Sequence, residues 1–131
     1  MTFSCTTGRI SPHLEELARR RPALALAAGG TARALARMLA ERERGGRTSG
    51  PLPLPAGKLA ELRDRLVAAP LRERLRMRGV RRGRADLLPT GAIVLATVAD
   101  VLGLERLTAS DWGLREGVLL EALGQRAGKL R

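Results

Sequence analysis

The chain has 131 residues and a formal charge of +11 at pH 7, because 24 lysines and arginines outnumber 13 aspartates and glutamates. Arginine supplies nearly all of this charge, since Lys58 and Lys129 are the only lysines. An apolar share of 44% is enough to bury a core, which argues against a disordered polybasic tail and fits one domain or part of one. The basic composition predicts an acidic partner.

Cysteine and histidine occur once each, as Cys5 and His13. A lone cysteine cannot form a disulfide or a cysteine zinc site within the chain, and it favours a reducing setting. We expect no Ser-His-Asp or Cys-His catalysis, because it would depend on His13 beside a helix start. The N-terminus lacks the apolar core of a signal peptide, and the apolar run 87–102 is too short for a membrane helix. We therefore expect a cytoplasmic chain with no membrane partner.

The first third of the chain predicts a helix, a buried strand and a second helix. A serine and a proline predict the start of the first helix, over 11–21. The apolar run 23–28 precedes two glycines and predicts a buried parallel strand. Thr31 is placed to cap the next helix, over 31–43. Residues 1–10 are expected to be poorly structured.

The middle of the chain combines a connector, an amphipathic helix and a basic segment. Residues 44–56 are turn-rich and predict a connector that separates elements rather than forming one. Leucines at steps of three and four predict a helix over 59–70, and 71–77 adds a short helical piece. The segment 72–84 contains seven arginines and one acid, a local charge of +6.

The last third predicts a helix, a strand and a final helix. Residues 92–102 are apolar on nearly all sides, which predicts a helix buried between layers. A short strand is expected over 107–110, with Asp111 as the cap of a helix over 113–123. Residues 124–131 are expected to be a basic tail. The face of the last helix expected on the core comprises Leu114, Val118, Leu119 and Ala122.

These elements predict a helix-rich α/β fold. Only two strands are evident, and parallel strands need cover on both faces and neighbours at their edges. The chain is therefore expected to lean on a partner or to be one section of a larger polypeptide.

Two segments are candidates for binding an anion. The turn formed by Gly29, Gly30 and Thr31 leaves backbone N–H groups free at a helix start, where a phosphate can approach closely. The alternative is a tight turn in which Thr31 only caps. In the cluster 72–84, each guanidinium offers a planar fork that matches phosphate oxygens. The alternative there is a solvated surface. Nucleic acid is a competing polyanion, although two aromatic residues leave little to stack single-stranded bases.

A third candidate lies at the start of the last helix, where Arg115 and Glu116 stand between Gly113 and Gly117. Arg115 either forms a surface ion pair with Glu116 or faces an anion held between this helix end and the glycine turn.

Three segments together resemble the exopolyphosphatase/guanosine pentaphosphate phosphatase (Ppx/GppA) family. They are the run from Gly29 to Ala36, the Gly-Arg-Ala-Asp segment at 83–86 that leads into Pro89-Thr-Gly-Ala, and the run 107–117 with its Gly-Leu-Arg-Glu-Gly. They follow the family's order and separations over about residues 12–123, which makes the resemblance specific.

The resemblance implies a sugar kinase/Hsp70/actin-like fold, in which two α/β lobes surround a cleft for phosphorylated substrate and Mg²⁺. The family's first phosphate loop, water-activating glutamate and Asp-x-Gly-Gly-Gly-Ser-type loop have no counterpart here. The chain thus resembles a partial C-terminal lobe over 11–123, interrupted by the connector 44–56. The resemblance implies that its own residues bind no Mg²⁺ and supply no catalytic group.

By the same resemblance, the phosphate-binding residues are Gly29, Gly30, Thr31, Arg84 and Arg115, while Asp86 orients Arg84 or caps the next helix. The expected function is that of a truncated phosphatase whose parent hydrolyses terminal phosphoanhydride bonds of polyphosphate or guanosine pentaphosphate, inactive alone. Its expected partners are those phosphates and a missing N-terminal lobe or a homodimer partner. The alternatives are a basic helical module that binds nucleic-acid phosphates and a subunit that completes another chain.

Overall fold

The computed structural model describes residues 14–20, 22–44 and 50–128. Residues 14–19 are helical, and the expected start of this helix at 11–13 lies outside the described residues, as do 1–10. The elements that follow are β1 (Leu26–Ala27), α2 (Gly30–Arg44), β2 (Leu52–Pro55), α3 (Ala56–Ala68), α4 (Leu71–Arg74), a 3-10 turn (Arg82–Arg84), α5 (Leu88–Val101), β3 (Arg106–Ala109) and α6 (Leu114–Gly128). The expected helix-rich α/β class is confirmed. Within these ranges, no helix has the length and apolar character needed to span a bilayer.

The strands form one sheet in the order β1-β3-β2. β1 pairs parallel with β3, which places Leu26 beside Thr108. The expected parallel pairing is thus confirmed, but the expected burial of the run 23–28 is wrong: Ala27 is buried, whereas Leu24 and Leu26 are 67% and 63% exposed. The reason is that helices cover one face of the sheet, and Leu26 lies on the other.

The expected connector contains a strand, which sequence reasoning missed. β2 runs antiparallel to β3, with Leu54 opposite Leu107, and Leu54 is fully buried. Pro53 and Pro55 hide this strand in the sequence, because proline cannot donate a ladder hydrogen bond and argues against a central strand. β2 lies at the edge of the sheet and, among the described strands, pairs with β3 only. An edge strand tolerates residues that donate no ladder hydrogen bond, so β2 can contain both prolines.

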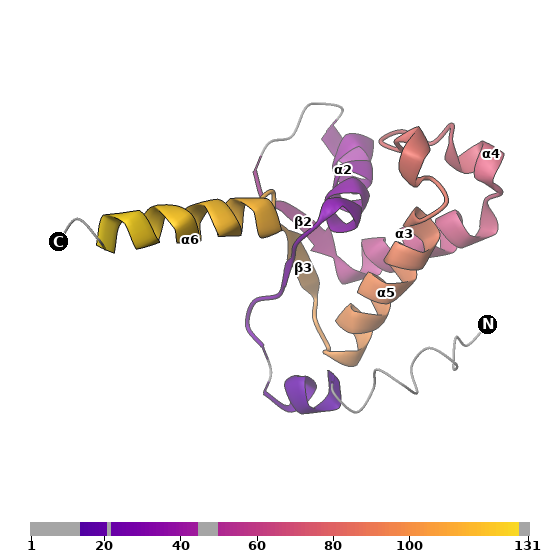
Figure 1. The fold of residues 1–131 in the computed structure, drawn as a ribbon. Coiled ribbons are helices and arrows are strands. Elements are labelled where there is room, and N and C mark those ends of the chain that lie inside the picture. The colour runs from indigo at the N-terminus through magenta and orange to yellow at the C-terminus, as the bar shows by residue number, and fades with distance from the viewer. Residues whose placement is uncertain (1–13, 21, 45–49, 129–131) are drawn as a thin grey trace.

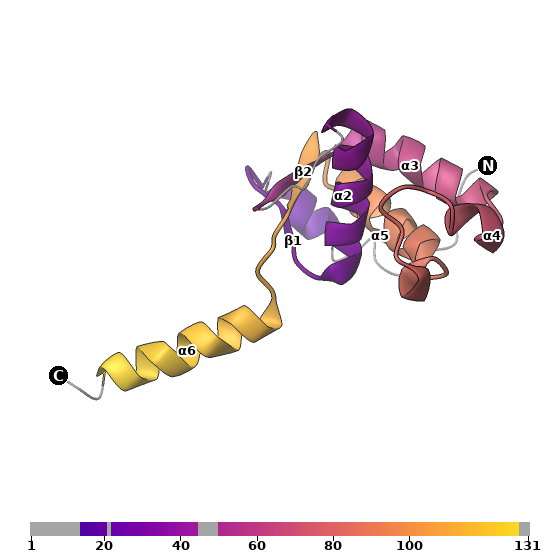
Figure 2. The ribbon, with the colours of Figure 1, turned by 90° about the horizontal axis from the view of Figure 1, so that it is seen from above.

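The core lies between the sheet and three helices, α2, α3 and α5 (Figures 1 and 2). α2 and α3 contact the sheet, and α5 packs against both of them. The expected inward spacing of α3 is confirmed by its buried leucines, Leu59, Leu62 and Leu66. Each buried leucine contributes about 1.5–3 kcal/mol through removal of apolar surface from water.

α5 is not buried on all sides as expected. It begins at Leu88, earlier than expected, because Pro89 fits a first helical turn. Its buried side chains, Leu88, Ala92, Ala96 and Ala99, recur at steps of three and four and face α2 and α3. Val94 is 41% exposed, since no second layer lies over that side.

α6 differs most from the expectation. The face expected on the core, Leu114, Val118, Leu119 and Ala122, is exposed. Figures 1 and 2 show α6 projecting away from the body of the molecule, and it makes little contact with the other described elements. The helix continues to Gly128, into the expected basic tail.

Candidate anion-binding site

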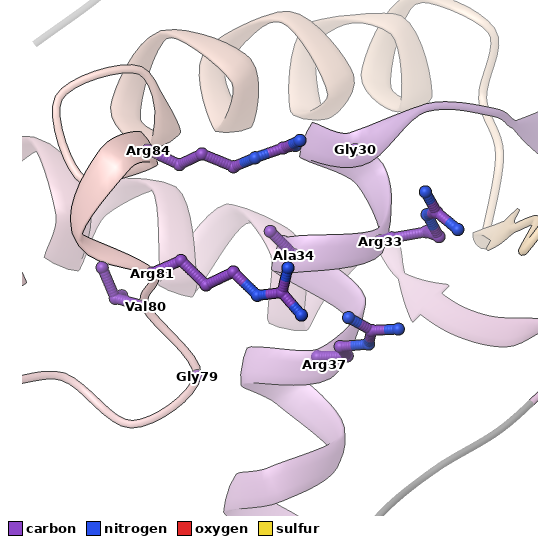
Figure 3. Close-up of a pocket in the computed structure, with 8 residues that line it drawn as sticks. All are labelled: Gly30, Arg33, Ala34, Arg37, Gly79, Val80, Arg81 and Arg84. Carbon is purple, nitrogen blue, oxygen red and sulfur yellow. The ribbon is translucent and has the colours of Figure 1, made fainter.

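A pocket of about 420 Å³ lies between α2 and the segment 79–84 (Figure 3). A volume of this size is typical of small-molecule sites. Among the described residues that line it there are four arginines and no carboxylate. The lining residues are Gly30, Arg33, Ala34, Arg37, Gly79, Val80, Arg81 and Arg84.

The glycine turn before α2 positions one wall of this pocket. Gly29 has a φ of +110°, a backbone conformation that favours glycine. The helix begins directly after it, and the N–H of Arg33 donates to the carbonyl of Gly29 at 3.2 Å. The first N–H groups of a helix carry a partial positive charge that attracts anions. Because Arg33 and Arg37 are four residues apart, they occupy one side of α2, along the pocket.

The opposite wall supplies Arg81 and Arg84, whose side chains extend toward α2 (Figure 3). The Arg84 guanidinium lies directly over Gly30, where a Cβ atom would overlap its Nη1. Gly30 therefore permits a close approach of Arg84 to the helix start that any larger residue would block.

Arg74 anchors the segment that carries these two arginines. Its Nε donates to the carbonyl of Ala69 and its Nη1 to the carbonyl of Ala85, both at 2.9 Å. This side chain links the end of α3 to the 3-10 turn. It thus has a structural role, which accounts for one member of the cluster 72–84.

The seven arginines of the cluster 72–84 therefore do not act as one group. Arg81 and Arg84 line the pocket, Arg74 is held by carbonyls, and Arg78 lines a separate cavity of about 240 Å³ beside Met77. Arg72, Arg76 and Arg82 are exposed outside the pocket lining. Two arginines of α2, Arg33 and Arg37, line the pocket together with Arg81 and Arg84.

The structure brings together some of the residues expected at the site. Gly30 and Arg84 meet at the pocket, with Gly29 just before it. Thr31 lies within the first turn of α2 rather than capping it, because the helix already begins at Gly30. A Cβ atom at Gly91 would overlap the methyl group of Thr31, so these two residues mark a close contact between α2 and α5.

Arg115 lies apart from these residues. It is exposed on α6 and is not among the lining residues. Asp86 accepts the N–H of Leu87 at 3.0 Å, and α5 has no side-chain cap. Sequence reasoning did not single out Arg33 or Arg37, although their spacing after a glycine turn is a signal that could have identified them.

The connection between β3 and α6 is tied to α2. Nη1 of Arg33 donates to the Asp111 carbonyl at 2.9 Å, and the Asp111 carboxylate accepts the Gly50 N–H at 2.6 Å. Asp111 therefore does not cap α6 as expected. Instead, Oε2 of Glu116 accepts the Gly113 N–H at 2.7 Å, and this bond holds the pKa of Glu116 below the ordinary glutamate value.

The described residues do not fit a magnesium site. Mg²⁺ is bound by carboxylate and other oxygen ligands, whereas this pocket offers guanidinium groups. Over the described ranges, no three His, Cys, Asp or Glu side chains are grouped so that they could hold a metal ion. The pocket is therefore suited to an anion.

Comparisons with known proteins identify the family of this chain. Residues 1–126 match the sequence profile of the Ppx/GppA phosphatase family. The guanosine-5'-triphosphate,3'-diphosphate pyrophosphatases of Aeromonas hydrophila and Aeromonas salmonicida are each 29% identical over 97 residues, 74% of this chain and 18% of theirs.

Solved structures of Ppx/GppA proteins and of an exopolyphosphatase also align with this chain. An exopolyphosphatase from Cytophaga hutchinsonii aligns with a TM-score of 0.77 and 27% identity, covering 88% of this chain and 38% of that one. A Ppx/GppA protein from Aquifex aeolicus aligns with a TM-score of 0.70 and 28% identity, covering 90% and 40%. The chain thus spans less than a fifth of the curated relatives and about two fifths of the solved ones. Sequence and fold together show that this chain belongs to the Ppx/GppA phosphatase family.

Proposed function

We propose that this chain binds the phosphates of polyphosphate or of a guanosine polyphosphate in the arginine pocket, as one wall of a Ppx/GppA cleft. The observation that carries the proposal is that Arg33, Arg37, Arg81 and Arg84 line one pocket beside the first turns of α2. The names of the similar proteins, an exopolyphosphatase and two guanosine-5'-triphosphate,3'-diphosphate pyrophosphatases, support this class of ligand.

The roles of the side chains follow from their placement. Arg81 and Arg84 each offer forked donors to phosphate oxygens, and the N-terminal N–H groups of α2 add to the attraction. The guanidinium groups around the pocket repel one another, and a bound anion relieves that repulsion. A chain of phosphates spreads its negative charge over several such groups at once.

We further propose that the chain alone does not hydrolyse its ligand. Cleavage of a terminal phosphoanhydride bond by this family is expected to need a carboxylate that activates water and Mg²⁺ that offsets phosphate charge. Neither fits the arginine pocket. In this proposal both belong to another lobe, which completes the cleft.

Titration calorimetry with polyphosphate of defined length tests the binding proposal. Arg81→Gln and Arg84→Gln should each weaken binding about 5- to 20-fold, the effect of removing a charge-assisted hydrogen bond at an open site. Arg106→Gln removes an equal charge at an exposed position of β3 outside the pocket and should change affinity less than about 2-fold. Arg115→Gln, on α6, should behave like Arg106→Gln. Equal losses in all four variants would contradict a localised site.

Competition with duplex DNA of equal total charge separates the alternative. A preference for polyphosphate or guanosine tetraphosphate supports the phosphatase-family ligand, and the reverse order supports a nucleic-acid module. Phosphate release with Mg²⁺ present should stay at background for the wild-type chain. Release that disappears in Glu116→Gln or Glu121→Gln would overturn the proposal that catalysis lies elsewhere.

A further inference from the structure

Arg33 links the anion pocket to the connection between β3 and α6. The residue lines the pocket, and its Nη1 donates to the Asp111 carbonyl at 2.9 Å, across a separation of 78 residues along the chain. Figure 3 shows its guanidinium apart from those of Arg81 and Arg84. A contact between distant segments, and not α2 alone, therefore sets the position of this side chain.

The side chain of Asp111 fixes the carbonyl that Arg33 uses. Its carboxylate accepts the Gly50 N–H at 2.6 Å, and hydrogen bonds to ionised groups are stronger than neutral ones. One residue earlier, the Ser110 N–H donates to the Ala27 carbonyl at 3.0 Å, which continues the pairing of β1 with β3. Asp111 is thus held between the end of the sheet and Gly50.

The start of α6 also interacts with Arg33. The Gly113 N–H bond is the largest cause of the lowered pKa of Glu116, and the charge of Arg33 is a further cause. Because this attraction is mutual, the Glu116 carboxylate and the Asp111 carbonyl both favour the present position of the guanidinium. They oppose the repulsion that Arg33 meets from the other arginines around the pocket.

The bond to Asp111 leaves Arg33 able to bind an anion. A guanidinium has several N–H donors, and the Asp111 carbonyl occupies Nη1. The remaining donors can bond a phosphate oxygen while that bond persists. A side chain already held in place also loses less conformational entropy when a ligand binds.

We propose that Arg33 binds a phosphate while it stays bonded to the Asp111 carbonyl, so that Asp111 is a positioning residue of the anion pocket and ligand binding is coupled to the β3–α6 connection. The inference rests on the proposed phosphate ligand. Such coupling is reciprocal: the bond between Arg33 and Asp111 strengthens binding, and a bound anion steadies the connection.

Trp112 is a reporter of this connection. It is the only tryptophan of the chain, it directly follows Asp111, and its backbone N–H donates to Oγ of Ser110 at 3.1 Å. Polyphosphate has no chromophore, so a change in tryptophan emission on its addition arises from the protein. Saturating polyphosphate should change the emission of the wild type.

Two pocket variants separate the link from binding itself. In Arg33→Met the emission change should be lost even at saturating polyphosphate, because no side chain then joins the ligand to Asp111. Arg37→Met removes an equal charge from the same pocket, and it should weaken binding but keep the emission change at saturation. Titration calorimetry on the same samples establishes saturation.

A double-mutant cycle tests Asp111 as a positioning residue. Asp111→Ala should weaken polyphosphate binding about 3- to 10-fold through loss of the Gly50 bond. Asp111→Asn, whose amide oxygen can accept the same N–H, should stay within about 2-fold of the wild type. Because Asp111 acts through Arg33, adding Asp111→Ala to Arg33→Met should cost no further affinity. Asp100→Ala, an equal charge change at an exposed position of α5 outside the pocket, should not weaken binding.

The outcomes distinguish this inference from the proposed function. Wild-type binding without a change in emission, or additive losses in the double variant, would overturn the inference and leave the phosphate ligand in place. Absence of calorimetric binding by the wild type would overturn both. Far-UV circular dichroism checks the folding of each variant, and the emission test on Arg33→Met does not depend on the folding of Asp111→Ala.

Discussion

Gly30 is the residue on which the geometry of the pocket depends most directly. The position lacks a Cβ atom, and the Arg84 guanidinium occupies the space that such an atom would fill. The overlapping atoms belong to the far end of a long, flexible side chain, which can move away at low cost. A larger residue would therefore displace Arg84 without disrupting the core.

Gly30→Ala should separate binding from stability. The free energy of unfolding should change by less than about 1 kcal/mol, because alanine favours the helix that begins there and Arg84 can swing aside. Polyphosphate affinity should fall about as far as in Arg84→Gln, as measured by calorimetry beside urea unfolding. Gly57→Ala, where an added Cβ meets no atom within 4 Å, is the control and should retain affinity. Full affinity in Gly30→Ala would contradict the placement of Arg84 at the ligand.

The stability of the first turn of α6 depends on pH through the carboxyl group of Glu116. The Gly113 N–H bond, followed by the N–H of Glu116 itself, lowers the pKa of this carboxyl in the folded chain. A lowered folded pKa means that the carboxylate stabilises the helix start fully above the ordinary glutamate pKa of 4.5. That stabilisation is lost as the pH falls through the folded pKa.

A pH titration by circular dichroism should show this loss. The wild type should lose helical signal below about pH 4.5 in a step that Glu116→Gln lacks, since the amide side chain does not ionise. Glu121→Gln, which removes a carboxylate of the same helix without touching Gly113, should keep the step. The same titration curve for wild type and Glu116→Gln would show that this carboxylate does not control the helix start.

At the level of elements, the packing of α2 on α5 sets the position of the pocket. The two helices approach closely where Thr31 of α2 meets Gly91 of α5. Thr31 is β-branched and has little freedom to rotate away. A change at this contact should therefore act on the stability of the helix pair.

Gly91→Ala should destabilise the fold by about 1–3 kcal/mol, the usual cost of overpacking, in urea unfolding. Thr31→Ser deletes the methyl group that an added Cβ would overlap, while the hydroxyl lies at 3.9 Å from that position. The double variant should therefore recover most of the lost stability. Additive losses in the double variant would mean that the two helices are not in this contact.

At the level of the whole molecule, the net charge of +11 attracts polyanions from a distance, but only a few arginines contact a ligand in the pocket. Long-range attraction between exposed charges is screened over about 10 Å at 0.1 M salt and about 3 Å at 1 M. Direct hydrogen bonds to phosphate are less sensitive to salt than this general attraction.

Salt should therefore distinguish the pocket from the rest of the surface. Raising the salt from about 0.05 M to about 0.5 M should nearly abolish duplex DNA binding and weaken polyphosphate binding more moderately. The ratio of wild-type to Arg84→Gln affinity for polyphosphate should persist in both conditions, as measured by calorimetry. A ratio that falls to about one at high salt would mean that Arg84 acts only through general charge.

The sequence by itself determined the helices of the body, the glycine turn before α2 and the family. These features depend on neighbours within a few residues: the leucine spacing of α3, a glycine at positive φ, and short motifs in a fixed order. Local periodicity and backbone preference act before any distant contact forms, so they can be read along the chain.

Tertiary structure decided what depends on residues far apart in the chain. Pro53 and Pro55 argue against a strand until the strand lies at a sheet edge. The spacing of Leu114, Val118 and Leu119 predicts burial of α6 on the core, but these side chains are exposed, because α6 makes little contact with the other described elements. The pocket combines arginines from 33–37 with others from 81–84, a meeting set by the packing of α2 against the 79–84 segment. Local patterns contain no information on such meetings, because they arise only when distant surfaces bury one another.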